Sequence, residues 1–188
     1  MVAASLRAVV LRSAGAAPLV IGSLLGLRGG PGRPRDLGVQ DYGGGQKSLG
    51  LCPPAPSCVS TAEDPADREH YAPPWNYNPL LGRGGVPGGA ASREQAMREL
   101  EAAVAECRED GYSPRIVERR ADYLGAEFKS RWLGAVDDVE FWFPPGTGSR
   151  VEYRSAARAG GDDQGAGRRR VRALRRALEK SGWRSERL

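Results

Sequence analysis

Three segments in the second half of the chain alternate between apolar and polar residues, and this pattern constrains the fold more than any other feature of the sequence. They span residues 123–129, 136–143 and 150–155, and apolar side chains recur in each at every second position. Because side chains of a strand point alternately to its two faces, this period indicates strands with one apolar face. A fourth candidate strand, 115–119, precedes them across a short turn. The short connections predict a small antiparallel sheet of about four strands.

Two amphipathic helices are predicted on either side of these strands. Ser92 with Gln95 matches the capping box, in which each side chain satisfies a free backbone N–H, so a helix is expected to start there and to end near Gly111. A second apolar stripe at helical spacing predicts a helix over 166–180. The order helix, four strands, helix predicts an α+β domain over 92–188, with the two helices covering one face of the sheet.

The N-terminal half has a different composition. Residues 1–35 contain five Arg and no acidic residue, which is typical of an organelle transit peptide. The apolar stretch 16–27 is too short to cross a bilayer but would suit a second export signal, for example into a thylakoid lumen. We therefore expect 1–50 to be a transit peptide and disordered linker, 51–91 to be a Pro/Gly-rich extended arm ending in flexible residues 82–89, and the chain to have no transmembrane span.

The three cysteines leave one alternative open. Cys52 and Cys58 lie in the short segment CPPAPSC, whose spacing allows a disulfide in an oxidising compartment and equally allows two free thiols in a tight turn. Cys107 lies on the first predicted helix and is expected to be a small buried apolar residue. The cysteines and the single histidine, His70, match no zinc module. We expect no metal and no cofactor.

Carboxylates and arginines on the predicted sheet form the best candidate for a small-ligand site. Adjacent strand residues point to opposite faces, so Asp138 and Glu140 share a face. We expect a polar network that links them with Arg154, Ser155 and Arg158. The alternative is a set of cross-strand charge pairs on a solvent-exposed face. No nucleophile elbow, phosphate loop or dinucleotide fingerprint occurs, so no catalytic residue is assigned.

The last predicted helix is rich in arginine. Its basic face consists of Arg168, Arg169, Arg170, Arg172, Arg175 and Arg176. These residues would attract RNA or anionic lipid. The alternative is pairing with the acidic middle of the chain, because residues 61–163 carry a net charge of −6 and residues 164–188 a net charge of +7. Nucleic acid is disfavoured, since no RNA-binding signature or interleaved aromatic residue accompanies the arginines.

Several separated blocks of this sequence resemble one family. CPPAPSCVST, RIVERRADYLGAEF, LGAVDDVEFWFPPGTGSRVEYRSAAR and GRRRVRALRRAL are similar, in type and order, to the domain-of-unknown-function 1499 family over residues 51–188. HYAPPWNYNPLLG, SREQAMRELE and LEKSGW resemble its plant and green-algal plastid branch. The resemblance implies a chloroplast protein of the stroma or thylakoid lumen, with the mitochondrion as the alternative, and it implies no established reaction.

These observations favour a non-catalytic, thylakoid-associated accessory or assembly protein. We expect it to dock on a protein partner, such as a thylakoid complex, through the aromatic side chains Trp75, Tyr77, Trp142 and Trp183. A small-ligand binder or enzyme that uses the acidic and arginine sheet face is one alternative. RNA or anionic-lipid binding by the last helix is the other.

Overall fold

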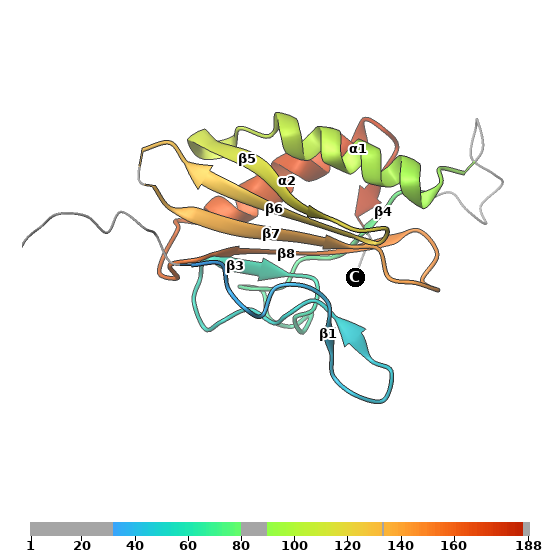
Figure 1. Cartoon of the computed structure of the whole chain (residues 1–188), viewed down its shortest axis with the longest axis horizontal. Helices are drawn as coiled ribbons and strands as arrows, with labels where there is room; N and C mark the ends of the chain where they lie inside the picture. The colour runs from blue at the N-terminus through green and yellow to red at the C-terminus, as the bar shows by residue number, and fades with distance from the viewer. Residues whose placement is uncertain (1–31, 80–89, 133, 186–188) are drawn as a thin grey trace, which may run out of the picture.

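The computed structural model describes residues 32–79, 90–132 and 134–185. The predicted transit peptide up to residue 31 and the predicted flexible residues 82–89 lie outside this part of the chain. The helices are α1 (Arg93–Glu106) and α2 (Ala166–Glu179), with a short 3-10 turn at Glu109–Gly111 (Figure 1). The strands are β1 (Gln40–Asp41), β2 (Lys47–Ser48), β3 (Cys58–Ser60), β4 (Trp75–Asn76), β5 (Tyr112–Arg119), β6 (Tyr123–Ser130), β7 (Val136–Trp142), β8 (Arg150–Ala157) and β9 (Arg184–Ser185).

The main sheet confirms the α+β class and the antiparallel pairing, but the predicted number of strands was wrong. It has seven strands in the order β5-β6-β7-β8-β4-β9, and β3 also pairs with β8. The four predicted strands are its long members, β5 to β8. The additional strands are two or three residues long and lie in segments rich in Pro, Gly or charge, so they carry no period-two pattern. Two of them, β3 and β4, belong to the segment expected to be an extended arm.

Both helices cover one face of the sheet, as the apolar stripes predicted (Figure 1). Helix α1 begins where expected, because Ser92 Oγ accepts a hydrogen bond from the backbone N–H of Gln95 at 3.1 Å. The apolar side chains of α1, α2 and the four long strands form one buried core, which consists in part of Met97, Leu100, Val104, Leu124, Phe128, Val139, Phe141, Val151, Leu174 and Leu178. Hydrophobic burial between the helices and the sheet is therefore the main source of stability.

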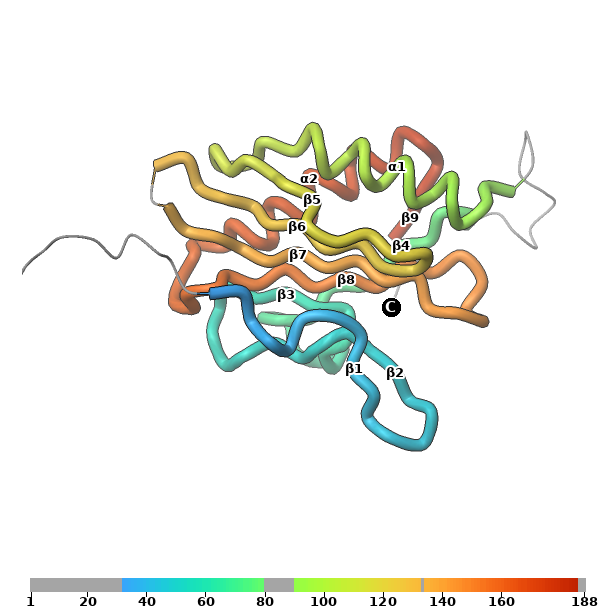
Figure 2. Tube along the Cα trace, viewed as in Figure 1, coloured from blue at the N-terminus to red at the C-terminus, as the bar shows by residue number. Residues whose placement is uncertain are grey.

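The opposite face of the sheet is also covered. Residues 32–50, which the sequence assigned to a linker, lie across it and include the β1–β2 hairpin; we call them the N-terminal cover (Figure 2). Leu49 of the cover is fully buried against Tyr123 and Trp142. The face that the sequence predicted to be solvent-exposed is thus an interior surface, and its charged residues must find partners within the protein.

Candidate functional site

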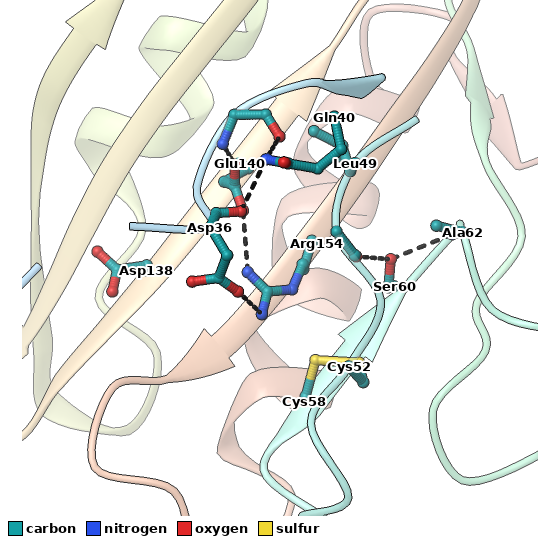
Figure 3. A network of polar contacts seen from close by, with 12 residues as sticks. Asp36, Gln40, Leu49, Cys52, Cys58, Ser60, Ala62, Asp138, Glu140 and Arg154 are labelled. Carbon is teal, nitrogen blue, oxygen red and sulfur yellow. Dashed lines mark hydrogen bonds and ion pairs between the residues drawn. A yellow bond between two sulfur atoms is a disulfide. The ribbon is translucent and has the colours of Figure 1, made fainter. Parts of the chain in front are cut away.

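The predicted polar residues of the sheet lie beneath the N-terminal cover. Asp138 and Glu140 share a face of β7, as predicted, and are only 4% and 1% exposed. Arg154 on β8 lies opposite Glu140 in the register, and its Nη1 donates to Glu140 Oε2 at 3.1 Å (Figure 3). Four of the five predicted residues are therefore on one covered face, and the fifth, Ser155, is not.

Glu140 holds the cover to the sheet. Its Oε1 accepts hydrogen bonds from the backbone N–H of Gly38 at 2.5 Å and from the Tyr123 hydroxyl at 2.8 Å. Gly38 has φ +101°, a conformation that favours glycine, and it lets the cover bring its N–H onto the carboxylate. Burial raises the pKa of Glu140 above its ordinary value, while these donors and Arg154 oppose the rise.

Arg154 adds a second link between sheet and cover. Its Nη2 lies 3.4 Å from Asp36 Oδ2, so one guanidinium joins a strand carboxylate to a carboxylate of the cover (Figure 3). The side chain is 5% exposed, and its Nε has no hydrogen-bond partner within the described part of the chain. The charges in this cluster are close-packed and internally paired, which is the arrangement of a structural clamp.

A second ion-pair cluster lies further along the same face. Arg158 donates from Nε and Nη2 to both oxygens of Asp138, at 2.9 and 2.5 Å, and from Nη2 to Glu127 at 2.7 Å. Arg115 donates to the other oxygen of Glu127 at 2.7 Å. The arginine partners lower the pKa of Glu127, and the carboxylate partners raise the pKa of Arg158. Glu140 pairs with Arg154 across β7 and β8, as the alternative from the sequence expected, but this face is covered and not solvent-exposed.

Ser155 lies on the opposite, helix-covered face, because it is the odd-numbered neighbour of Arg154 on an alternating strand. Its Oγ accepts a hydrogen bond from Arg170 of α2 at 3.1 Å. The other end of that guanidinium donates to Asp137 Oδ2 at 2.6 Å, and it packs over the rings of Tyr112 and Phe128, 4.7 and 4.6 Å from their centroids. The prediction that Ser155 belongs to the Asp138 network was wrong, since Ser155 faces the helices and accepts its hydrogen bond from Arg170.

The arginines predicted to form one basic face of α2 have different surroundings. Arg170 is buried against Asp137, and Arg169 pairs with Asp110 at 2.9 Å. Arg168 donates to backbone carbonyls of residues 68, 69 and 71. Arg175 is 3.6 Å from Glu179, and Arg172 and Arg176 are exposed. Helical geometry turns Arg170 inward, so the six residues do not form a continuous surface.

The aromatic residues predicted as partner contacts are mostly interior. Trp75, Trp142 and Trp183 are 1%, 6% and 1% exposed, and Tyr77 is half-buried. Trp75 packs 4.4 Å from the ring of Tyr153, and Tyr77 packs between Phe143 and Trp183. The prediction that these side chains are docking anchors does not fit this placement. Trp75, Tyr77 and Trp183 attach β4 and β9 to the core, and Trp142 on β7 packs against Leu49 of the N-terminal cover.

The arm is fixed by a disulfide and by the histidine. Cys52 and Cys58 form a disulfide with a Cα–Cα distance of 5.6 Å, and Cys107 is a buried free thiol. His70 lies with Nδ1 2.8 Å from Asp67 Oδ2 and Nε2 3.2 Å from the carbonyl oxygen of Ala55. The hydrogen bond with Asp67 raises the pKa of His70. Because both ring nitrogens face acceptors, the protonated imidazole fits this position best.

One exposed residue was missed by the sequence analysis. Trp132, in the turn after β6, is 86% exposed, and its ring lies over Gly111, where an added Cβ would be 3.7 Å from Nε1. It borders a cavity of about 370 Å³ at the end of the sheet. Four carboxylates line this cavity, namely those of Asp110, Asp137, Asp162 and Asp163. A tryptophan in a turn outside every periodic segment would have been the available signal.

The described residues also bear on metal binding and on membrane insertion. Among residues 32–79, 90–132 and 134–185, no group of three or more His, Cys, Asp or Glu side chains is arranged to hold a metal ion. Within the same ranges, no helix has the length and apolar character needed to cross a bilayer.

The fold and the site define an α+β protein with one antiparallel sheet, covered by helices on one face and by the N-terminal cover on the other. The chain belongs to the DUF1499 family, whose description is "protein of unknown function", and the match covers residues 48–178. No curated protein matches the chain, and no solved structure matches it.

Proposed function

We propose that this protein is a non-catalytic accessory or assembly factor of the plastid, associated with the thylakoid, and that it docks on a protein partner through the end of the molecule that carries Trp132. The observation that supports this proposal is the exposure of Trp132, at 86%, beside a cavity. Tryptophan is strongly enriched among the residues that dominate the energy of protein interfaces.

The charge at the end of the molecule that carries Trp132 indicates the chemistry of the partner. Asp110 is paired with Arg169, and Asp137 with Arg170. The side-chain oxygens of Asp162 and Asp163 accept hydrogen bonds from backbone N–H groups of the α2 approach, from Gln164, Gly165 and Gly167. Among the residues that the structure describes, the carboxylates of Asp162 and Asp163 thus have no arginine partner. The complementary partner is a protein segment that carries Lys or Arg beside an apolar residue able to pack on the indole.

The proposed compartment is supported by the N-terminal end of the chain. The first 35 residues combine five Arg with no acidic residue, and this composition supports import into an organelle. The region that matches the family, 48–178, contains two of the segments that resemble its plastid branch, HYAPPWNYNPLLG and SREQAMRELE. The charged residues of the sheet support a non-catalytic role, because each oxygen of Asp138 and Glu140 already accepts a hydrogen bond within the fold.

The proposal is tested by zero-length cross-linking. The tagged full chain is incubated with detergent-solubilised thylakoids, and a carbodiimide then couples its carboxylates to lysines of any docked partner. We expect peptides that join Asp162 or Asp163 to lysines of one thylakoid protein. Trp132→Ala should reduce these cross-links about thirtyfold, since interface hot spots contribute about 2 kcal/mol or more.

Tyr42→Ala is the matched control, because Tyr42 is another exposed aromatic residue, at 54%, on the distant β1–β2 hairpin. It should leave the cross-links unchanged. Equal cross-linking by wild-type protein and Trp132→Ala, or cross-links that arise only from other faces, would refute docking at this end.

A further inference from the structure

A second cavity lies between α2 and the arm, away from Trp132. Its volume is about 140 Å³, which is below the range of about 300–1,000 Å³ that holds drug-sized ligands. Val59, Tyr153 and Val171 form an apolar floor. Three arginines of α2 stand around it, Arg168, Arg172 and Arg175, and we call it the arginine cavity. A space of this size suits a small group rather than a whole metabolite.

The positive charge of the arginine cavity is only partly neutralised. Arg168 donates to the backbone carbonyl oxygens of residues 68, 69 and 71, which are neutral acceptors. Arg172 is exposed and pairs with no carboxylate among the residues that the structure describes. Arg175 has one carboxylate nearby, that of Glu179 at 3.6 Å. Of three guanidinium charges, two therefore have no carboxylate counterpart.

Two buried donor atoms without a hydrogen bond within the described residues border the same cavity. They are Ser185 Oγ and Arg175 Nε, of which the latter lies 3.6 Å from Glu179 Oε1, too far for a hydrogen bond. A guanidinium nitrogen only donates, and a serine hydroxyl readily donates. Burying such groups without partners costs free energy, so they mark a place where an acceptor would be stabilised. The positive field also reaches Tyr153, whose pKa is raised by burial and lowered by Arg175 and Arg168.

We propose that the arginine cavity is a binding site for a phosphoryl group, with Arg172 and Arg175 as charged donors and the Ser185 hydroxyl as a neutral donor. A phosphoryl group is small, carries the opposite charge and offers several acceptor oxygens. Arginine is well suited to it, because its planar fork matches the spacing of phosphate oxygens. The group belongs either to a free phosphate or to a lipid headgroup, and the apolar floor excludes water from one side of it.

The first arm of the test is calorimetric titration of the full chain with inorganic phosphate, at an ionic strength kept constant with chloride. The second arm is co-sedimentation with phosphatidylglycerol vesicles, with pure phosphatidylcholine vesicles as the blank. Saturable binding in the first arm identifies free phosphate. Binding in the second arm alone, when phosphate does not compete, identifies a headgroup. Either result supports the site if Arg172→Gln weakens binding about tenfold or more.

Two variants separate this site from the general charge of α2. Arg176→Gln removes the same charge from the same helix one turn further on, outside the arginine cavity, and should bind like the wild type. Ser185→Ala should weaken binding while keeping or increasing thermal stability, because the free protein loses an unpartnered buried hydroxyl. An equal loss in Arg176→Gln and Arg172→Gln would overturn the proposal, as would the absence of saturable binding in both arms.

Discussion

The buried pair of Asp137 and Arg170 gives the sharpest test of how this fold is stabilised. Their side chains are 2% and 1% exposed, and Arg170 Nη2 donates to Asp137 Oδ2 at 2.6 Å. Arg170→Met keeps an unbranched side chain over the aromatic rings but leaves a buried carboxylate without its counter-charge. Removing one partner of such a pair costs about 3–5 kcal/mol. That is a large part of the roughly 5–15 kcal/mol that stabilises a domain.

The cost should depend on pH in a defined direction. Burial already raises the pKa of Asp137 despite Arg170, and the loss of Arg170 removes the main opposing charge. A carboxyl group whose pKa is higher in the folded state favours folding when it is protonated. The Arg170→Met protein should therefore lose stability as pH rises from the ordinary Asp value, 3.8, through the raised pKa.

Urea unfolding followed by circular dichroism measures the effect at several pH values. Arg169→Met is the matched control, since its pair with Asp110 is 42% and 31% exposed and should contribute under about 1 kcal/mol. The double variant Arg170→Met with Asp137→Leu should recover most of the lost free energy, because replacing both charges leaves no buried ion. If Arg170→Met costs no more than Arg169→Met, the buried pair does not have the energetic role argued here.

Three further predictions concern the N-terminal half. The pKa of His70 in the folded protein is above 6.5, so its stabilising effect should be complete below pH 6.5 and decline as pH rises through the folded pKa. Urea unfolding of the wild type and of His70→Gln across this pH range checks the sign. Reduction of the Cys52–Cys58 disulfide should lower the free energy of unfolding by about 2 kcal/mol, since it closes a short loop, and a reductant should not affect the double Ser variant. Glu140→Ala should speed hydrogen exchange of the Gly38 amide; unchanged exchange in residues 36–50 would mean that Glu140 does not hold the cover.

The long elements could be predicted because their signals are local. The alternation in 123–129 and 136–143 located β6 and β7 and assigned Leu124 and Phe141 to the core. Ser92 marked the start of α1 through a single side-chain hydrogen bond. Such signals depend on residues within one helical turn or one strand, so a sequence displays them directly.

The cover and the short strands could not be predicted because their stabilising partners are distant in sequence. Gly38 bonds to Glu140, 102 residues away, and Arg154 pairs with Asp36, 118 residues away. A strand such as β4, Trp75–Asn76, exists only because β8 and β9 lie on either side of it. A strand of two residues is too short to show an alternating pattern of apolar and polar residues.

The candidate site was predicted in part for the same reason. Strand alternation was sufficient to place Asp138 and Glu140 on one face, but it could not reveal that this face would be covered. Once the cover is present, charges expected in water become interior ion pairs. Ser155 was misassigned because the prediction grouped it with Arg154 by proximity in sequence, although neighbours on a strand face opposite ways.

The N-terminal cover also sets a limit on how the chain can be matured. Asp36 and Gly38 lie in the cover and contact Arg154 and Glu140. If the proposed leader is removed, a cut upstream of Asp36 would preserve these contacts. A cut close to residue 50 would remove the N-terminal cover and expose the charged side chains of the sheet to water. The position of the cut would then decide whether this face of the sheet stays covered.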